Sequence, residues 1–248
     1  MTRNVRTYDH FCMVARALER VGDRWNLLVI RDLLTGAKRF TDLMDRLGGI
    51  TPKTLTVRLR ELEEAGIVAV DREPGRREVW YRLTPAGQDL GPVIDGLSWW
   101  GQRHAWRRPL PGEPLHAEHL LRSAVRAIEH SAGDNGRDGV VEEDGPARWR
   151  FLLDGADYLV ESDGQRWSLA AGAPSGPVDV AITGTTQALI ALIFSRSDEG
   201  IDIAGEDGPV RRFRQLIGTM AATVAPAGET GQSAARGDIQ VPSGRQAR

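Results

Sequence analysis

The sequence predicts an α+β protein of two domains, the first mainly helical and the second a sheet with helices. The length of 248 residues exceeds that of one small module. Helical periodicity in the first part gives way to two strand-like runs, and the second part alternates strand-like and helical runs. Between them lie Pro109, Pro111 and Pro114, which stop a helix and indicate a stiff, extended connector.

These features predict a first domain over residues 1–108, a linker over 109–115 and a second domain over 116–225. Residues 226–248 contain almost no large apolar side chain and should be a disordered tail. The contents of 41% hydrophobic and 27% charged residues are typical of soluble globular proteins. No apolar run is long enough to cross a membrane, and the N-terminus lacks the pattern of a secretory signal. The single cysteine, Cys12, fits a reducing compartment, so we expect a cytoplasmic protein.

Charge is distributed unevenly between the two parts. Residues 1–108 contain 19 Lys and Arg against 14 Asp and Glu, whereas residues 109–248 contain 13 against 20. The net charge of -2 therefore combines a basic first part with an acidic second part. This asymmetry favours a polyanionic partner for the first part only.

The first part begins with helices. Asp23 fits the N-cap of a helix over 24–35, whose apolar residues wrap most of its circumference and place it at the centre of a domain. A short amphipathic helix over 40–47 is closed by two glycines at 48 and 49. After a tight turn, Thr51 and Pro52 begin a third helix, in which Leu55, Leu59 and Leu62 form the buried stripe.

A change of period follows. Residues 67–70 and 79–83 are strand-like and are joined by an arginine-rich turn over 71–77. Thr84 and Pro85 then open a long helix reaching about residue 106. One face of this helix carries leucines and valine, and Trp99 and Trp106 project from the opposite face. Apolar residues on two opposed faces predict packing against the helix's own domain and against a second subunit, with Trp99 and Trp106 at that interface.

Two short helices joined by a glycine turn and followed by a hairpin form the outline of a winged helix-turn-helix. A helix fits the major groove of DNA, where its first turn presents side chains to base edges. Opposite the leucine stripe, Lys53, Thr54 and Val57 are predicted to read bases, and Arg58 and Arg60 to clamp phosphates. The full set of candidate DNA-binding residues is Thr51, Lys53, Thr54, Thr56, Val57, Arg58, Arg60 and, in the wing, Arg72, Arg76 and Arg77. The alternative is an ordinary solvated surface, which three glutamates in the last turns of the helix favour there.

These segments resemble the HxlR-type transcriptional regulators, relatives of the MarR group. The resemblance rests on CMVARAL at 12–18, GDRW at 22–25, IRDLL at 30–34, RFTDL at 39–43, LRELEEAG at 59–66 and YRLTPAG at 81–87. It runs in order from about residue 10 to 106. It implies a homodimer, built from the first and last helices of the domain, that binds a pseudo-palindromic operator in double-stranded DNA with half-sites about 10 bp apart.

Cys12 lies where some members of that family carry a redox-sensing cysteine. As a thiol switch near Arg16 and a helix N-terminus, it would have a lowered pKa, and its oxidation would link or distort the dimer. The alternative is a small buried residue between Phe11 and Met13, which is the commoner role of a lone cysteine.

The second part reads as a helix over 115–131, strands over 147–153, 157–160, 166–169 and 178–182, a helix over 185–194, a short strand near 201 and a final helix over 209–220. With VDVAITG at 178–184 and IAGEDG at 203–208, this order resembles the sterol-carrier-protein-like fold. The resemblance implies a cavity for a lipid-like or aromatic small molecule, near Trp149, Phe151, Trp167, Ile193 and Phe194. Plain core packing predicts the same composition, so each residue keeps that alternative.

Catalysis has little support in the sequence. His116 and His119 lie one helical turn apart without a third ligand at metal spacing, and a solvated helix face is the expected explanation. No nucleophile motif, phosphate-binding loop, metal or cofactor site is recognisable. We therefore expect a regulator that is not an enzyme, represses from a DNA operator and responds to an apolar effector. The alternatives are redox sensing through Cys12, or a small-molecule carrier whose helical half only dimerises.

Overall fold

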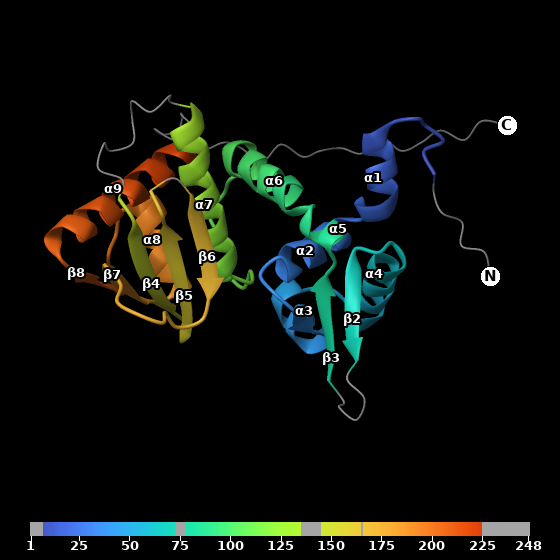
Figure 1. Cartoon of the computed structure of the whole chain (residues 1–248), viewed down its shortest axis with the longest axis horizontal. Helices are drawn as coiled ribbons and strands as arrows, with labels where there is room; N and C mark the ends of the chain where they lie inside the picture. The colour runs from blue at the N-terminus through green and yellow to red at the C-terminus, as the bar shows by residue number, and fades with distance from the viewer. Residues whose placement is uncertain (1–6, 73–77, 135–144, 165, 225–248) are drawn as a thin grey trace.

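The computed structural model describes residues 7–72, 78–134, 145–164 and 166–224 (Figure 1). In its first half the elements are α1 (Met13–Val21), α2 (Arg24–Leu33), β1 (Lys38–Arg39), α3 (Phe40–Leu47), α4 (Pro52–Glu64), β2 (Val68–Arg72), β3 (Val79–Leu83), α5 (Pro85–Gln88) and α6 (Gly91–His104). The strands form a small antiparallel sheet in the order β1-β3-β2, with Val70 opposite Tyr81 in the hairpin. The predicted helices before the hairpin, the turn between α3 and α4 and the hairpin itself are confirmed; the two-residue β1 is an addition.

The second half contains α7 (Ala117–Asp134), β4 (Ala147–Leu153), β5 (Ala156–Ser162), β6 (Trp167–Ala171), β7 (Val180–Gly184), α8 (Thr186–Ser195), β8 (Ile201–Gly205) and α9 (Asp207–Val224). Its sheet has the order β6-β5-β4-β7-β8. The β4–β7 pair is parallel and the other neighbours are antiparallel. The expected α+β class, with a mixed sheet in the second half, is confirmed.

Each half has its own hydrophobic core. In the first half, Val29, Ile30 and Leu33 of α2 pack with the leucine stripe of α4 and with Leu43 of α3. In the second half, burial alternates along β4, so Trp149 and Phe151 share the face covered by α7, α8 and α9 (Figure 1). Residues 105–116, which contain the predicted linker, have neither helix nor strand. No helix among the described residues is long and apolar enough to cross a membrane.

The prediction of one unbroken helix from Thr84 to about residue 106 is wrong. The structure has the short α5, a turn, and then α6 beginning at Gly91. Pro92 in the first turn of α6 has no N–H to donate to the carbonyl of Gln88, and its ring crowds that carbonyl. The break changes the direction of α6, which crosses toward α7 of the second half (Figure 1). The predicted tail over 226–248 lies outside the described residues.

Candidate nucleic-acid interface

Local chemistry fixes both ends of the α3–α4 turn. Gly48 and Gly49 follow α3 with φ of +48° and +65°, a left-handed conformation that glycine adopts without strain. Thr51 then caps α4: its hydroxyl accepts a hydrogen bond from the Thr54 amide at 3.2 Å, and Pro52 occupies the first turn. On the inner face, Leu55 and Leu62 are fully buried, which holds α4 against α2.

The outer face of α4 carries the predicted base-reading residues. Lys53 and Thr56 are exposed, and Thr54 and Val57 are half-buried beside them. The first turn of α4 contains no acidic residue. Within the described part of the chain, Lys53 makes no hydrogen bond or ion pair, so its ammonium group is available to a partner.

The two arginines predicted to clamp phosphates already have protein partners. Arg58 bridges Asp23, the N-cap of α2, at 3.1 Å and Glu61 at 2.7 Å. Arg60 pairs with Glu64 at 2.7 Å but keeps 72% of its side chain exposed. Arg60 is therefore better placed than Arg58 to exchange its partner for a phosphate.

The wing is described in part. Arg72 is exposed at the end of β2, while Arg76 and Arg77 lie outside the described residues. Toward the tip end of β3, the guanidinium of Arg39 lies 5.7 Å from the ring centroid of Trp80 and pairs with Glu78. The predicted roles of the wing arginines stay predictions.

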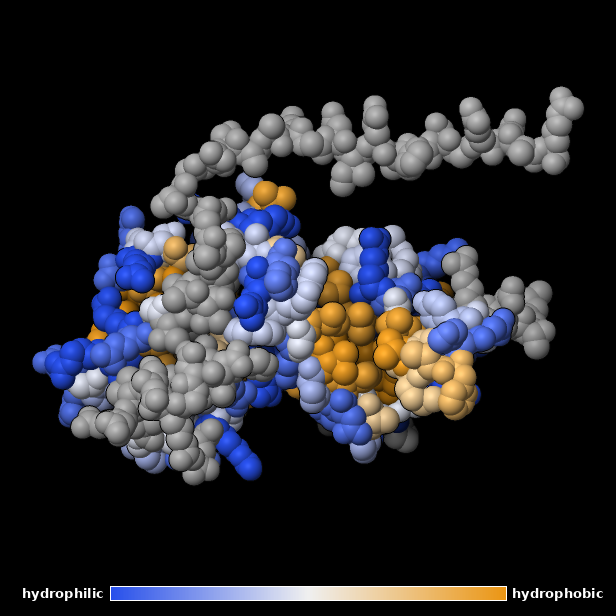
Figure 2. All heavy atoms as spheres, turned by 90° about the horizontal axis from the view of Figure 1, so that it is seen from above, coloured by the Kyte–Doolittle hydropathy of each residue, from blue (hydrophilic) through white to orange (hydrophobic). Residues whose placement is uncertain are grey.

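An apolar surface covers α1 and α6. Its exposed side chains are Phe11, Met13, Val14 and Leu18 near α1, and Val93, Leu97 and Trp100 on α6. Figure 2 views the molecule from the side on which these helices lie and shows a hydrophobic area on the first half. Trp99 is half-buried beneath Arg103, and Trp106 packs against Phe194 of its own chain with ring centroids 5.1 Å apart. Trp106 lies beyond the end of α6, so of the two tryptophans only Trp99 is on this helix, and the exposed apolar face of α6 is the other one. An interface at Trp99 and Trp106 stays a prediction.

Cys12 occupies the N-cap position of α1 and is half-buried. Its side chain makes no capping hydrogen bond. Phe11 beside it is 91% exposed, so the cysteine does not lie in a core. Redox sensing by Cys12 stays a prediction.

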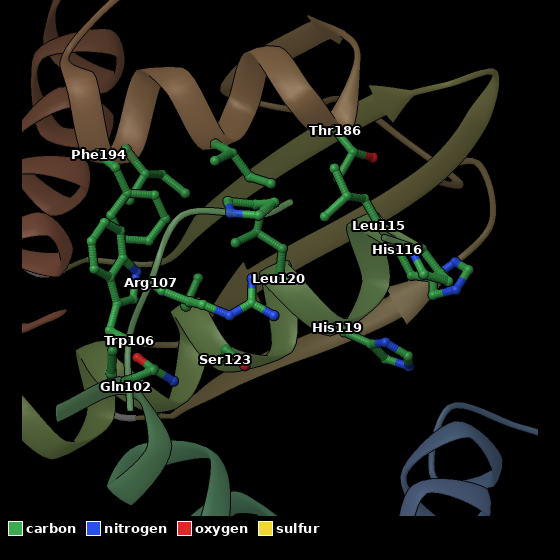
Figure 3. Close-up of a pocket in the computed structure, with 16 residues that line it drawn as sticks. Gln102, Trp106, Arg107, Leu115, His116, His119, Leu120, Ser123, Thr186 and Phe194 are labelled. Carbon is green, nitrogen blue, oxygen red and sulfur yellow. The ribbon is translucent and has the colours of Figure 1, made fainter. Parts of the chain in front are cut away.

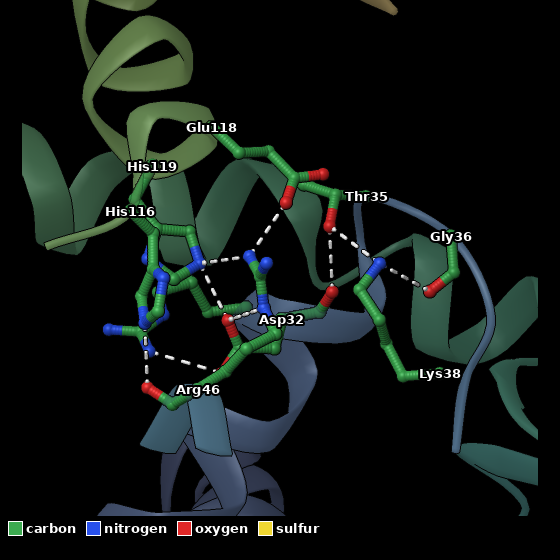
Figure 4. A network of polar contacts seen from close by, with 9 residues as sticks. Asp32, Thr35, Gly36, Lys38, Arg46, His116, Glu118 and His119 are labelled. Atoms are coloured by element: carbon green, nitrogen blue, oxygen red, sulfur yellow. Dashed lines mark hydrogen bonds and ion pairs between the residues drawn. The ribbon is translucent and has the colours of Figure 1, made fainter. Parts of the chain in front are cut away.

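A buried polar network joins the helix-turn-helix to the second half (Figure 4). Arg46, in the last turn of α3, contacts Asp32 of α2 at 3.3 Å and Glu118 of α7 at 2.6 Å. His119 contacts Asp32 at 2.6 Å, and His116 lies 2.9 Å from the carbonyl oxygen of Arg46. His116 and His119 therefore hold α7 onto α2 and α3, and the expectation of a solvated face is wrong.

Asp32 is the centre of this network. Its side chain is fully buried, and burial raises its pKa; the hydrogen bond from His119 and the charges of Arg31 and Arg46 outweigh that effect and lower the pKa to about 2. Burial, together with the same arginines, lowers the pKa of His119 despite the opposing effect of Asp32. At neutral pH, His119 is therefore a neutral imidazole that donates its Nε2–H to Asp32.

The predicted ligand residues fall into different environments. Trp149 and Phe151 pack against Phe213 in the core, where the remaining cavity is about 30 Å³, room for about one water molecule. Trp167 packs against Trp149 with the two rings tilted by 43°, and it lines a separate cavity beside α7. Ile193 lines both the core cavity and a cavity of about 290 Å³ at the junction of the two halves. Phe194 also lines the junction cavity, as Figure 3 shows. Among the described residues, no cluster of three or more metal-ligating side chains occurs.

Comparisons with known proteins concern the first half. The HxlR-like helix-turn-helix family model matches residues 20–109. An uncharacterized HTH-type transcriptional regulator of Mycobacterium tuberculosis is 44% identical over 110 residues, or 43% of this chain and 66% of that protein, just under two thirds. One from Methanothermobacter thermautotrophicus is 33% identical over 106 residues, or 42% of this chain and 81% of that protein. The chain belongs to the HxlR-like helix-turn-helix family.

Solved structures show the same limited coverage. The redox regulator HypR in its oxidized form is 31% identical, covering 40% of this chain and 100% of that one, with a TM-score of 0.37. The reduced form of the transcriptional regulator YodB from B. subtilis is 33% identical, covering 38% and 95%, with a TM-score of 0.35. The relatives in the HxlR-like family are named as transcriptional regulators, which agrees with the expectation that this chain is not an enzyme.

The family match ends at residue 109, before α7, the helix of the second half that contacts the helix-turn-helix. Glu118 and His119 lie 72 and 73 positions from Arg46 in the sequence, and no local pattern connects them. The one available signal was Asp32, a carboxylate in the last turn of a helix that is otherwise apolar on most sides. A buried carboxylate near a helix C-terminus requires cationic or hydrogen-bonding partners from elsewhere.

Proposed function

We propose that this chain is a sequence-specific regulator of transcription that binds double-stranded DNA as a homodimer and represses from an operator near its own gene. The observation that carries the proposal is the outer face of α4. It presents Lys53, Thr56 and Val57 from a capped helix whose first turn has no acid, in a family of HTH-type regulators. Such a face suits insertion into the major groove.

A second copy of the chain is the proposed partner of the apolar surface on α1 and α6. Large side chains there stay accessible, with Phe11 91% and Trp100 59% exposed. Contiguous apolar surface of this kind marks an interface. A two-fold dimer would place two copies of α4 on one face of a pseudo-palindromic operator, with half-sites about 10 bp apart.

We also propose that the second half senses a small apolar effector, lipid-like or aromatic. The resemblance to the sterol-carrier-like fold supports this, as does the contact between α7 and the helix-turn-helix through Arg46. A ligand that binds one position of α7 better than another would shift the spacing of the two α4 helices.

Fluorescence anisotropy tests DNA binding directly. The purified chain is titrated onto the intergenic DNA beside its own gene and onto scrambled DNA of equal length, near physiological salt. We expect a preference of about a thousandfold. Equal, weak affinity for both DNAs, with the effector site empty or filled, would overturn the proposal and favour a small-molecule carrier whose helical half only dimerises.

A further inference from the structure

An apolar opening of the second half lies at its junction with the first. This junction cavity, of about 290 Å³, is enclosed by the end of α6, the connector, α7 and α8 (Figure 3). Its apolar wall is formed by Trp106, Leu120, Ile190, Ile193 and Phe194. The volume is close to the lower end of the range for small-molecule sites. The sheet-facing core, with about 30 Å³ free, has no room for such a molecule.

An adjoining cavity of about 580 Å³ extends toward α2 and α3 and shares Trp106, Arg107, Pro114 and His119 with the first. The charged side chains lining the two cavities are Arg31, Arg46, Arg107 and Glu113. The carboxylates that balance Arg31 and Arg46 lie behind them: the side chains of Asp32 and Glu118 are 0% and 7% exposed and line neither cavity. The surface that faces the opening is therefore apolar on one side and cationic on the other.

Arg107 is the most accessible of these cations. Its side chain is 56% exposed and forms a bidentate pair with Glu113, with one N–H donating to Oε2 at 2.8 Å. Both partners lie in the segment between α6 and α7, and the pair is open to solvent. A carboxylate or sulfonate on a ligand could replace Glu113 in the same geometry, because guanidinium binds such groups through two parallel hydrogen bonds.

We propose that the junction cavity binds a small organic anion with an aromatic or other apolar body, and that its occupancy alters the position of the α3–α4 turn. The body would lie between Trp106, Leu120 and Ile190, and the acid group would meet Arg107. This inference rests on the proposed regulatory function for its consequence in DNA binding, but the binding site itself does not.

The walls of the cavity touch the helix-turn-helix directly. Pro114 lines both cavities, and a Cβ added to Gly48 would lie 2.6 Å from its Cγ, so the connector packs tightly on the turn between α3 and α4. His116 and His119 also line both cavities and contact Arg46 and Asp32 respectively. A ligand that moves the connector or α7 must therefore move these contacts to α2, to α3 and to the turn.

Two fluorescent probes test the site in the full-length chain: anilinonaphthalene sulfonate, which is anionic, and N-phenyl-1-naphthylamine, which has a similar body without the charge. Ile190→Trp fills the cavity from α8, and Gln187→Trp adds the same side chain on the exposed side of that helix. We expect the sulfonate to bind wild type and Gln187→Trp with similar Kd and Ile190→Trp at least tenfold more weakly. Equal binding by both variants would place the probe elsewhere, such as on the apolar surface of α1 and α6, and overturn the site.

The anionic part of the inference has its own variants at the exposed rim. Glu113→Gln removes the competing carboxylate and should tighten sulfonate binding severalfold. Arg107→Ala should weaken it to the level of the uncharged probe. Unchanged binding of the sulfonate by both variants would contradict recognition of an acid group.

Coupling is measured by repeating the operator titration with saturating sulfonate probe. We expect operator affinity to change by at least about fivefold in wild type and Gln187→Trp and to stay constant in Ile190→Trp. Constant affinity in wild type overturns the coupling. If the chain shows no preference for operator DNA, the proposed function fails, while the probe titrations still decide whether the site exists.

Discussion

Arg58 and Lys53 lie five positions apart on one helix, but their side chains are in different environments. Arg58 is 23% exposed and links α4 to Asp23, which in turn accepts a hydrogen bond from the Trp25 amide at the start of α2. Lys53 is exposed and makes no ion pair within the described part of the chain. Arg58 therefore forms a structural contact between α4 and α2, whereas Lys53 is free to bind a partner such as DNA.

Arg58→Ala should therefore lower the free energy of unfolding by about 1 kcal/mol, as expected for loss of a partly buried ion pair, with little change in sequence preference. Lys53→Ala should leave stability unchanged and relax the preference at one operator position by about 1–3 kcal/mol. Urea unfolding and anisotropy on operator variants separate the two effects. An Arg58 variant of wild-type stability whose binding becomes less salt-dependent would show that Arg58 contacts phosphate after all.

His119 gives the junction a pH dependence of defined sign. Its folded-state pKa lies below the ordinary value of 6.5, so the unfolded chain takes up a proton first as pH falls. The free energy of unfolding should decrease as pH drops from 6.5 toward the folded pKa and then level off for this group. Asp32, with a pKa of about 2 against an ordinary 3.8, adds a further loss only below about pH 4.

His119→Gln keeps a donor for Asp32 but cannot titrate. Its stability should therefore depend less on pH just below 6.5 than that of wild type, as measured by urea unfolding at a series of pH values. His10→Gln, at an exposed position, serves as the control and should retain the wild-type slope. Identical slopes for wild type and His119→Gln would show that His119 does not carry the effect.

At the scale of elements, capping residues, turn glycines and apolar periodicity predicted the helices whose ends and buried faces they determine. Thr51 with Pro52, the two glycines after α3 and the leucine stripe each specify their own position, and α4 forms where they place it. The break before α6 was missed although Pro92 is visible in the sequence, because the apolar period continues across it. Trp106 was expected on this helix, but α6 ends at His104, and Trp106 packs against Phe194 of the second half, a contact that no local pattern shows.

The exposed faces of α1 and α6 predict an assembly that a single charge disrupts. Leu97→Glu places a carboxylate in the middle of the α6 face, where Leu97 is 50% exposed. The dissociation constant of the dimer should rise at least about tenfold, which corresponds to about 1.4 kcal/mol of lost association free energy. The reason is that the carboxylate would lose its hydration in the interface. Light scattering over a concentration series measures this. The control Gln88→Glu adds the same charge at an exposed site on α5 and should stay dimeric. A wild-type chain that is monomeric at every concentration would contradict dimerisation through α1 and α6.

At the scale of the whole molecule, composition and the proline cluster predicted two parts but not how they meet. The same apolar and acidic residue types of the second half occur in a core, in a cavity wall and in a contact with the other half, so composition does not distinguish these environments. The predicted ligand residues Trp149 and Ile193 show this, because the fold sends the first to the sheet core and lets the second also line the junction cavity. Long-range pairs such as Arg46 with Glu118 arise only after both halves have folded.

Asp95 tests whether the halves unfold together. It is 9% exposed on α6 and receives two hydrogen bonds from Arg122 of α7, at 2.9 Å and 3.0 Å. Asp95→Ala leaves that guanidinium without its bidentate partner at the junction, and loss of one partner of a buried pair costs about 3 kcal/mol. Since each half has its own core, the weakened junction should let the two halves melt separately.

Scanning calorimetry should show one transition in wild type and two in Asp95→Ala. The control Asp89→Ala removes an exposed acid before α6 and should melt as wild type does. Two transitions already present in wild type would mean that the junction contacts are too weak to couple the halves, and an effector bound there could then act on DNA affinity only by creating that coupling.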